Sequence, residues 1–448
     1  MSAEQLALPS MSPRRRPRLL TLLTTTVVAA VVLACSPLLS PGASAAEVSG
    51  TAGLNYVALG DSYSSGFGLT PLTGAPVPGC AQSSSNYPHR IATALGMNLT
   101  DVTCSGATTA HITGPQATLG GTAPAQISAL SADTDVVTLT IGGNDVGFAT
   151  IAASCLALSP VGPLVASLAL PAGTPPINDC ASILATDPSL TALQAALPAS
   201  IATALTAVKT AAPNAKIFVL GYPSITPDPA NTPVGGCFTP AFTATGELTG
   251  LPNSFPFTNV DVTYLHTLEV GVNAVVEATA AAAGATYVPT FAPSVEHSAC
   301  APAGQSFING FTLTSLDAAA ATPGALHPND AGTGFLGTLA AASITQAFPA
   351  ITIPDPTPTP TPTPTTVPTP APTAAPTTAP TAAPTPSTTP APVVIRAQVP
   401  AVPAGSTRPR ELAATGVSGE QTLLAGSAAF LMLLAGVTGV LGARRRRS

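Results

Sequence analysis

The chain has 448 residues, of which 50 are proline and only 8% are charged, and it contains no tryptophan. Much of the proline lies in one tract, so the whole length is not expected to fold as one globule. Between residues 46 and 350 the basic side chains are Arg90, Lys209 and Lys216, against many acidic ones. This balance argues against nucleic acid and anionic membrane surfaces as partners.

The first 45 residues are typical of a targeting segment. A basic stretch at Arg14–Arg18 precedes an apolar run over residues 19–34, and Ala43-Ser44-Ala45 fits a signal-peptide cleavage site. We therefore expect residues 1–45 to be a signal peptide and the mature chain to begin near Ala46. A retained membrane anchor is the alternative interpretation. The pattern predicts a secreted, extracellular protein.

Six cysteines remain after residue 45, and an even number in an exported chain predicts disulfides. No Cys-x-x-Cys pair occurs, so we expect no zinc or redox site among them. Sequential pairing closes the shortest loops. The predicted disulfides are Cys80–Cys104, Cys155–Cys180 and Cys237–Cys300.

Residues 46–350 alternate between strand-like apolar runs and helical stretches. Strands are expected at 57–60, 98–104, 135–141, 216–220 and 286–288, and helices at 87–95, 124–130, 190–212, 262–283 and 330–348. This alternation predicts a single α/β domain with a parallel sheet covered on both faces. Two proline-rich stretches, 155–187 and 227–256, break the rhythm and are expected to be loops or small caps at the rim of the sheet.

The chain beyond the domain has two parts. Residues 351–411 carry Thr-Pro and Ala-Pro repeats, which predict a stiff, disordered stalk of polyproline II character. Residues 412–448 contain Leu412-Ala-Ala-Thr-Gly416, an apolar run long enough to span a membrane, and four terminal arginines. A plain membrane anchor is one interpretation. The order of these three features resembles a sortase sorting signal, which implies cleavage between Thr415 and Gly416 and attachment to cell-wall peptidoglycan.

Four short motifs carry the chemistry. Three follow expected strands and the fourth precedes the last helix: Gly60-Asp61-Ser62, Cys104-Ser105-Gly106, Gly142-Gly143-Asn144-Asp145 and His327-Pro328-Asn329. The carboxyl ends of parallel strands meet at one edge of the sheet, so the first three motifs are expected there, and the histidine can return to the same edge. Taken alone, Gly-Asp-Ser would be a capped turn.

Together and in this order, the motifs resemble those of the SGNH (GDSL) hydrolases, secreted bacterial esterases and lipases with a flavodoxin-like three-layer sandwich. The resemblance implies that Ser62 is the nucleophile and His327 the general base. It also implies an oxyanion hole formed by the N–H groups of Ser62 and Gly106 and the amide of Asn144. The implied protein is a monomeric serine esterase that acts on an ester or lipid without a metal or cofactor. Fixed donors and a neutral imidazole suit ester hydrolysis.

The sequence departs from the family pattern at one position. Many members carry an acid three residues before the histidine, where this chain has Gly324. Either a backbone carbonyl near Gly324 orients His327, or another acid does, the available ones being Glu296, Asp317 and Asp330. We favour the carbonyl, which fixes the imidazole tautomer with less charge stabilisation.

Two further functions fit parts of the sequence. A carbohydrate O-acetyl esterase would use the same fold and the same four residues. A non-catalytic surface module for adhesion or display would fit the stalk and the sorting signal, but it would not need all of Ser62, Gly106, Asn144 and His327.

Overall fold

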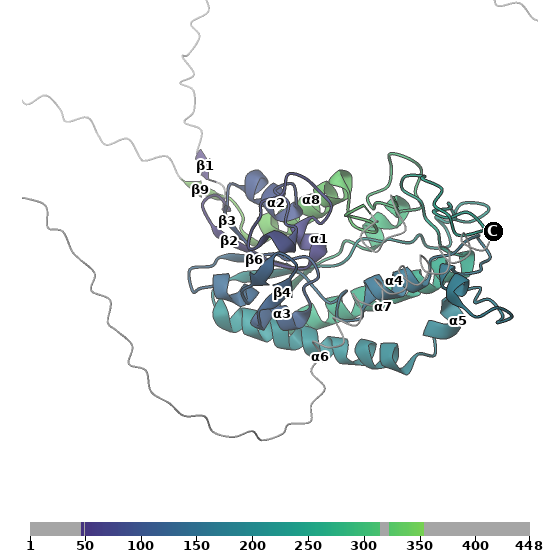
Figure 1. Cartoon of the computed structure of the whole chain (residues 1–448). Helices are drawn as coiled ribbons and strands as arrows, with labels where there is room; N and C mark the ends of the chain where they lie inside the picture. Colours follow the sequence, from purple (N-terminus) through teal and green to yellow (C-terminus); the bar gives the residue numbers. More distant parts are fainter. Residues whose placement is uncertain (1–45, 49, 314–321, 354–448) are drawn as a thin grey trace, which may run out of the picture.

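The structure is a computed structural model that describes residues 46–48, 50–313 and 322–353 (Figure 1). The expected signal peptide, most of the stalk, the sorting signal with Thr415 and Gly416, and Asp317 lie outside the described residues. Strand β1 (Ala46–Val48) pairs antiparallel with β9 (Ile351–Ile353). This strand pair brings together the first and the last of the described residues.

The centre of the fold is a parallel sheet of five strands in the order β3-β2-β6-β7-β8. The strands are β2 (Asn55–Gly60), β3 (Asn98–Asp101), β6 (Val136–Thr140), β7 (Lys216–Leu220) and β8 (Thr286–Val288). From β2 the chain first adds β3 on one side and then adds the later strands of this sheet, β6, β7 and β8, on the other. The edge of the sheet at the carboxyl ends of β2 and β6 is thus the topological switch point, where α/β folds place their sites.

Helices cover both faces of this sheet, as expected from its buried strands. Val57 and Leu59 of β2 pack with α6 and α7, whereas Tyr56 and Ala58 pack with α2 and α8. The helices are α1 (Ser62–Ser65), α2 (Tyr87–Leu95), α3 (Thr109–Thr113), α4 (Phe148–Ser154), α5 (Ala181–Leu184), α6 (Pro188–Ala211), α7 (Asn259–Ala282) and α8 (Asp330–Ala347). The predicted α/β fold with a parallel sheet is confirmed.

Two expected elements are shorter than predicted. The strand expected to reach residue 104 ends at Asp101, although the N–H of Cys104 still donates to the Gly60 carbonyl. The helix expected over 124–130 is a single 3₁₀ turn, Gln126–Ala129. The side chain of Gln126 explains its position, because its amide accepts from Gly60 N at 2.7 Å and donates to Gly60 O at 3.0 Å.

The two proline-rich stretches form one cap. Ala157 N donates to the carbonyl of Pro256 at 2.7 Å, which joins the stretches, and Phe255 and Phe257 pack edge to face in a shared core. A small hairpin, β4 (Gln116–Thr118) with β5 (Gly121–Ala123), lies elsewhere in the chain. The structure contains the disulfides Cys80–Cys104, Cys155–Cys180 and Cys237–Cys300, the last two of which lie in the cap and its borders.

Helix α6 is the helix of the described residues that is long and apolar enough to cross a membrane by length and composition. Its Leu197, Ile201 and Val208 are buried in the core beside the strands. These residues form the face of the helix that packs on the sheet, whereas 28% of its apolar window is buried in total.

A buried carboxylate ties α7 to the chain that follows β7. Glu269 is 4% exposed, and its Oε2 accepts from Ile225 N at 2.8 Å. Its Oε1 accepts from the hydroxyl of Thr226 at 2.7 Å. Burial raises the pKa of Glu269 to about 8, while the hydrogen bonds from Thr226 and Ile225 act in the opposite direction. The link holds the loop at the carboxyl end of β7 in place.

This carboxylate should make the domain less stable as the pH rises. An unfolded glutamate titrates near 4.5 and the folded one near 8, so between these values the folded chain holds a proton that the unfolded chain has lost. Stability from this group is therefore present at low pH and is lost as the pH rises through that window, by an amount of the order of a few kcal/mol. Glu269→Gln should reduce the difference between urea midpoints measured at about pH 5 and about pH 8.

The matched control is Glu277→Gln, an exposed glutamate on the same helix, which should keep the slope of the wild-type protein. An unchanged slope in Glu269→Gln would contradict the prediction.

Candidate active site

Ser62 opens α1 directly after β2, in a turn fixed from several sides. Asp61 caps the helix, and its Oδ1 accepts from Tyr63 N at 2.9 Å. Gly60 has φ +129°, and a Cβ there would meet the Thr140 carbonyl of β6 at 2.5 Å, so only glycine fits. Ser62 is 8% exposed. The turn therefore presents one serine hydroxyl on a rigid strand-to-helix connection.

His327 lies against this hydroxyl. Its Nε2 is 2.7 Å from Ser62 Oγ, and its Nδ1 is 2.8 Å from the carbonyl oxygen of Ala325. A carbonyl oxygen can only accept, so Nδ1 carries the proton and Nε2 is free to accept from the serine hydroxyl. The group that orients the imidazole is thus a backbone carbonyl one residue after Gly324.

The carboxylates considered from the sequence are used elsewhere or lie apart. Asp330 is exposed and pairs with Arg90 at 2.5 Å. Glu296 is exposed at the end of a 3₁₀ turn, Ala292–His297. Asp317 lies outside the described residues. Within the described ranges, no carboxylate is hydrogen bonded to His327.

The loop that carries His327 is held in an unusual conformation. Leu326 has φ +58°, in the left-handed region that a leucine rarely adopts, so the surrounding structure must hold it there. Its N–H donates to the Asn309 carbonyl at 3.0 Å, and its own carbonyl accepts from the Tyr63 hydroxyl at 2.6 Å. The Tyr63 ring also lies 4.9 Å from the imidazole of His327, centroid to centroid.

Sequence reasoning missed Tyr63. Its one signal is its position directly after Ser62, which places it near any base that reaches the serine.

Gly106 and Asn144 follow the strands on either side of β2. Gly106 has φ +78°, and the preceding Ser105 is joined to Ser65 of α1 by a 2.8 Å hydrogen bond between their hydroxyls. Asn144 Nδ2 donates to the Ala107 carbonyl at 2.9 Å. An amide nitrogen has two N–H donors, so this bond orients the side chain and leaves one donor for a bound oxygen.

Asp145 joins the same two loops. Its carboxylate accepts from Thr109 Oγ1 at 2.5 Å and from Thr109 N at 3.1 Å. Burial raises the pKa of Asp145, and these hydrogen bonds partly oppose the effect. Asp145 thus fixes the loop of Asn144 against the first turn of α3. Gly106 and Ala107 lie in the loop that directly precedes this helix.

Burial also sets the charge of the imidazole. It lowers the pKa of His327 to about 4, and the hydrogen bond to the Ala325 carbonyl opposes this shift. The imidazole is therefore neutral at pH 7, the state in which it can remove a proton from a hydroxyl.

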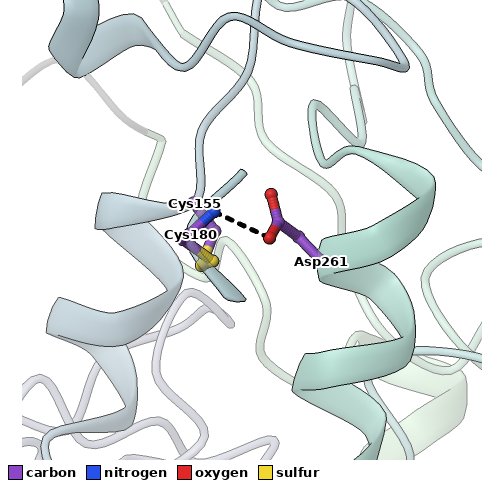
Figure 2. A group of neighbouring side chains, drawn as sticks. All are labelled: Cys155, Cys180 and Asp261. Atoms are coloured by element: carbon purple, nitrogen blue, oxygen red, sulfur yellow. Dashed lines mark hydrogen bonds between the residues drawn. A yellow bond between two sulfur atoms is a disulfide. The ribbon is translucent and has the colours of Figure 1, made fainter. Parts of the chain in front are cut away.

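One other group of side chains has the composition of a metal site. Cys155, Cys180 and Asp261 lie together at the start of α7 (Figure 2). Both sulfurs are in a disulfide and offer no thiolate. The Asp261 carboxylate accepts from the N–H groups of Cys180 at 2.8 Å and Ala181 at 3.0 Å. The group therefore consists of a disulfide and of a carboxylate that binds the N–H groups at the start of α5. Together they fasten the proline-rich cap to α7.

Comparison with known proteins agrees with the four motifs. Residues 58–334 match the GDSL-like Lipase/Acylhydrolase family, and this range contains Ser62, Gly106, Asn144 and His327. The chain is 37% identical over 266 residues to Lipase 2 of Streptomyces coelicolor, which covers 59% of this chain and 79% of the relative. It is 28% identical over 329 residues to an esterase of Streptomyces scabiei, and the match covers 68% of this chain and 89% of the relative.

Among solved structures, the chain is similar to phospholipase A1 from Streptomyces albidoflavus, with 26% identity, a TM-score of 0.46, and coverage of 65% of this chain and 99% of that one. Since the family match spans more than half of the sequence, the chain belongs to the GDSL-like lipase/acylhydrolase family and is a carboxylic ester hydrolase.

Proposed function

We propose that the protein hydrolyses carboxylic esters through an acyl-enzyme formed on Ser62, with His327 as general base and then general acid. The observation that carries this proposal is the 2.7 Å contact between Ser62 Oγ and His327 Nε2. It lies within the range over which a proton is transferred from a nucleophile to its base.

The proposed reaction has two similar halves. His327 Nε2 takes the proton of Ser62 as Oγ attacks the carbonyl carbon, and the carbonyl oxygen becomes an oxyanion. The oxyanion collapses, the C–O bond to the alcohol breaks, and the imidazolium gives its proton to the leaving alcohol oxygen. Water then repeats the sequence on the acyl-enzyme, with its proton passing through His327 to Ser62 Oγ as the acid leaves.

Three donors would stabilise the oxyanion: the backbone N–H groups of Ser62 and Gly106 and the free amide N–H of Asn144. Each such donor contributes about 3 kcal/mol to transition-state stabilisation when it is fixed before the reaction. The anchoring of Asn144 to Ala107 and of Asp145 to Thr109 supports this assignment, because it holds the donors in place without substrate.

The proposed catalytic pair is a dyad. The Ala325 carbonyl selects the tautomer with a proton on Nδ1, which is the task that the acid performs in a triad. A carbonyl dipole stabilises the imidazolium less than a carboxylate does. The desolvation of the half-buried His327 lowers its pKa, so the base stays neutral to low pH.

We further propose that the enzyme works outside the cell, held there by its C-terminus. The signal-peptide pattern of residues 1–45 and the three disulfides support export. The sorting-signal pattern supports cleavage by sortase between Thr415 and Gly416 and linkage to peptidoglycan, with the proline-rich stretch as a stalk. The substrate is an ester or lipid in the surroundings of the cell.

Removal of the nucleophile should abolish turnover. Ser62→Ala should lower kcat on a p-nitrophenyl ester by at least about 10⁴-fold, because no acyl-enzyme can form. A fluorescent organophosphonate should label the wild-type protein and leave the variant unlabelled. Hydrolysis by Ser62→Ala at the wild-type rate, or failure of the wild type to hydrolyse esters of any acyl length, would contradict the proposed mechanism.

The pH dependence of kcat/KM should show that the catalytic base has a low pKa. The base must be neutral, so activity is present above the pKa of His327 and falls as the pH drops through it. Because burial lowers this pKa to about 4, kcat/KM should stay near its plateau well below pH 6.5, the ordinary histidine value. Circular dichroism at each pH separates titration from unfolding. An acidic limb centred at or above pH 6.5 would contradict the lowered pKa of His327.

None of the three acids considered as partners of His327 should be essential. Glu296→Ala and Asp330→Ala should each retain kcat within about threefold of the wild type, because the Ala325 carbonyl already accepts the Nδ1 proton. Asp317→Ala, outside the described residues, is the companion variant with the same expectation. A loss of about a thousandfold in any of the three would identify a triad acid.

A further inference from the structure

Tyr222 is hydrogen bonded to residues next to the proposed site, and none of its hydrogen bonds within the described residues goes to Ser62 or His327. It follows β7 by two residues, is 8% exposed, and has its backbone N–H bound to Asn273 Oδ1 of α7 at 2.8 Å. Its ring packs edge on against Tyr63, with centroids 5.0 Å apart. Backbone and ring are therefore fixed independently of the hydroxyl.

The hydroxyl of Tyr222 makes two buried hydrogen bonds to different turns. It donates to Asp61 Oδ2 at 2.5 Å and accepts from Gly143 N at 2.8 Å. Asp61 directly precedes Ser62, and Gly143 directly precedes Asn144. One oxygen atom thus connects the turn after β2 to the turn after β6.

The second glycine of the Gly-Gly-Asn-Asp motif fits this arrangement. A Cβ at Gly143 would lie 3.1 Å from both Oη and Cζ of Tyr222, closer than a side chain normally tolerates. The missing side chain allows the tyrosine to approach the backbone N–H. The motif and the tyrosine, 79 residues apart, are therefore complementary in shape.

We propose that Tyr222 is a positioning residue that sets the distance between two oxyanion-hole donors, the N–H of Ser62 and the amide of Asn144. This inference rests on the proposed function of those donors. Donors stabilise an oxyanion only when they lie at about 2.7–3.1 Å from it, so a small separation of the two turns lowers the rate. Tyr222 acts through Asp61 and Gly143 and does not contact the substrate.

Loss of the hydroxyl should affect the chemical step selectively. In Tyr222→Phe the Asp61 carboxylate and the Gly143 N–H lose their shared partner, while ring packing remains. We expect kcat for an aryl ester to fall by about tenfold or more with KM within about twofold, because the hole acts on the transition state.

The test compares an aryl ester with the matching thionoester, in which sulfur replaces the carbonyl oxygen. Sulfur is a poor hydrogen-bond acceptor, so the oxyanion hole contributes little to thionoester turnover, whereas the serine and its base contribute to both. Tyr222→Phe should therefore lower ester turnover by about tenfold and thionoester turnover by less than about threefold. A merely destabilised protein would lose both activities in parallel.

The matched control is Tyr56→Phe. Tyr56 is a fully buried tyrosine of β2 whose hydroxyl shares a 2.6 Å hydrogen bond with Thr138 Oγ1 and not with a residue of the proposed site. This variant also loses one buried hydroxyl, and its ratio of ester to thionoester turnover should match the wild type. Equal losses of both activities in Tyr222→Phe, or no loss, would overturn the proposal.

Asp61→Asn keeps the inference testable if Tyr222→Phe does not fold. Asparagine retains the helix cap but places an amide N–H where the second carboxylate oxygen accepts from the Tyr222 hydroxyl, so it should show the same selective loss by a smaller factor. Absence of that selectivity would overturn the role of Tyr222. Failure of the wild-type protein to hydrolyse any ester would instead overturn the proposed function, which distinguishes the two.

Discussion

A 2.7 Å hydrogen bond joins Ser62 Oγ to His327 Nε2 across 265 positions of the chain. The rest of the structure is arranged so that both ends of this bond are rigid. The sheet fixes the serine, because β2 lies between β3 and β6 and its last residue is clamped by Gln126. The other end depends on a short loop before α8, whose left-handed leucine is held by Asn309 and Tyr63.

The imidazole of His327 is oriented without a carboxylate among the described residues. A triad acid both orients the imidazole and stabilises its charged form, and the Ala325 carbonyl supplies mainly the first. Burial then keeps His327 neutral to low pH. The acids that do lie near the site, Asp61 and Asp145, accept hydrogen bonds from neighbouring turns. Their carboxylates are structural supports for loops that carry the proposed oxyanion donors.

The cap, like the site, consists of loops that are held in place by buried side chains. Loops rich in proline cannot form regular elements that satisfy their own backbone groups, so they need other fastenings. Here these are two disulfides, an aromatic core, and the buried carboxylates of Asp261 and Glu269 on α7. Burial raises the pKa of both acids, so their contribution to holding the cap depends on pH. The contribution of the two disulfides depends on the redox state.

The sequence alone determined the α/β class, the five strands of the parallel sheet, the helices α2, α6, α7 and α8, and the motifs with Ser62, Gly106, Asn144 and His327. These leave a signal because apolar periodicity and side-chain chemistry are written in residue types. Only the tertiary structure decided that Ala325 orients the base, that Tyr63 and Tyr222 support the turns, and that two loops form one cap. A carbonyl acceptor exists at every residue, and contacts such as the one between Tyr222 and Gly143 arise only when distant segments meet, so no local pattern could reveal them.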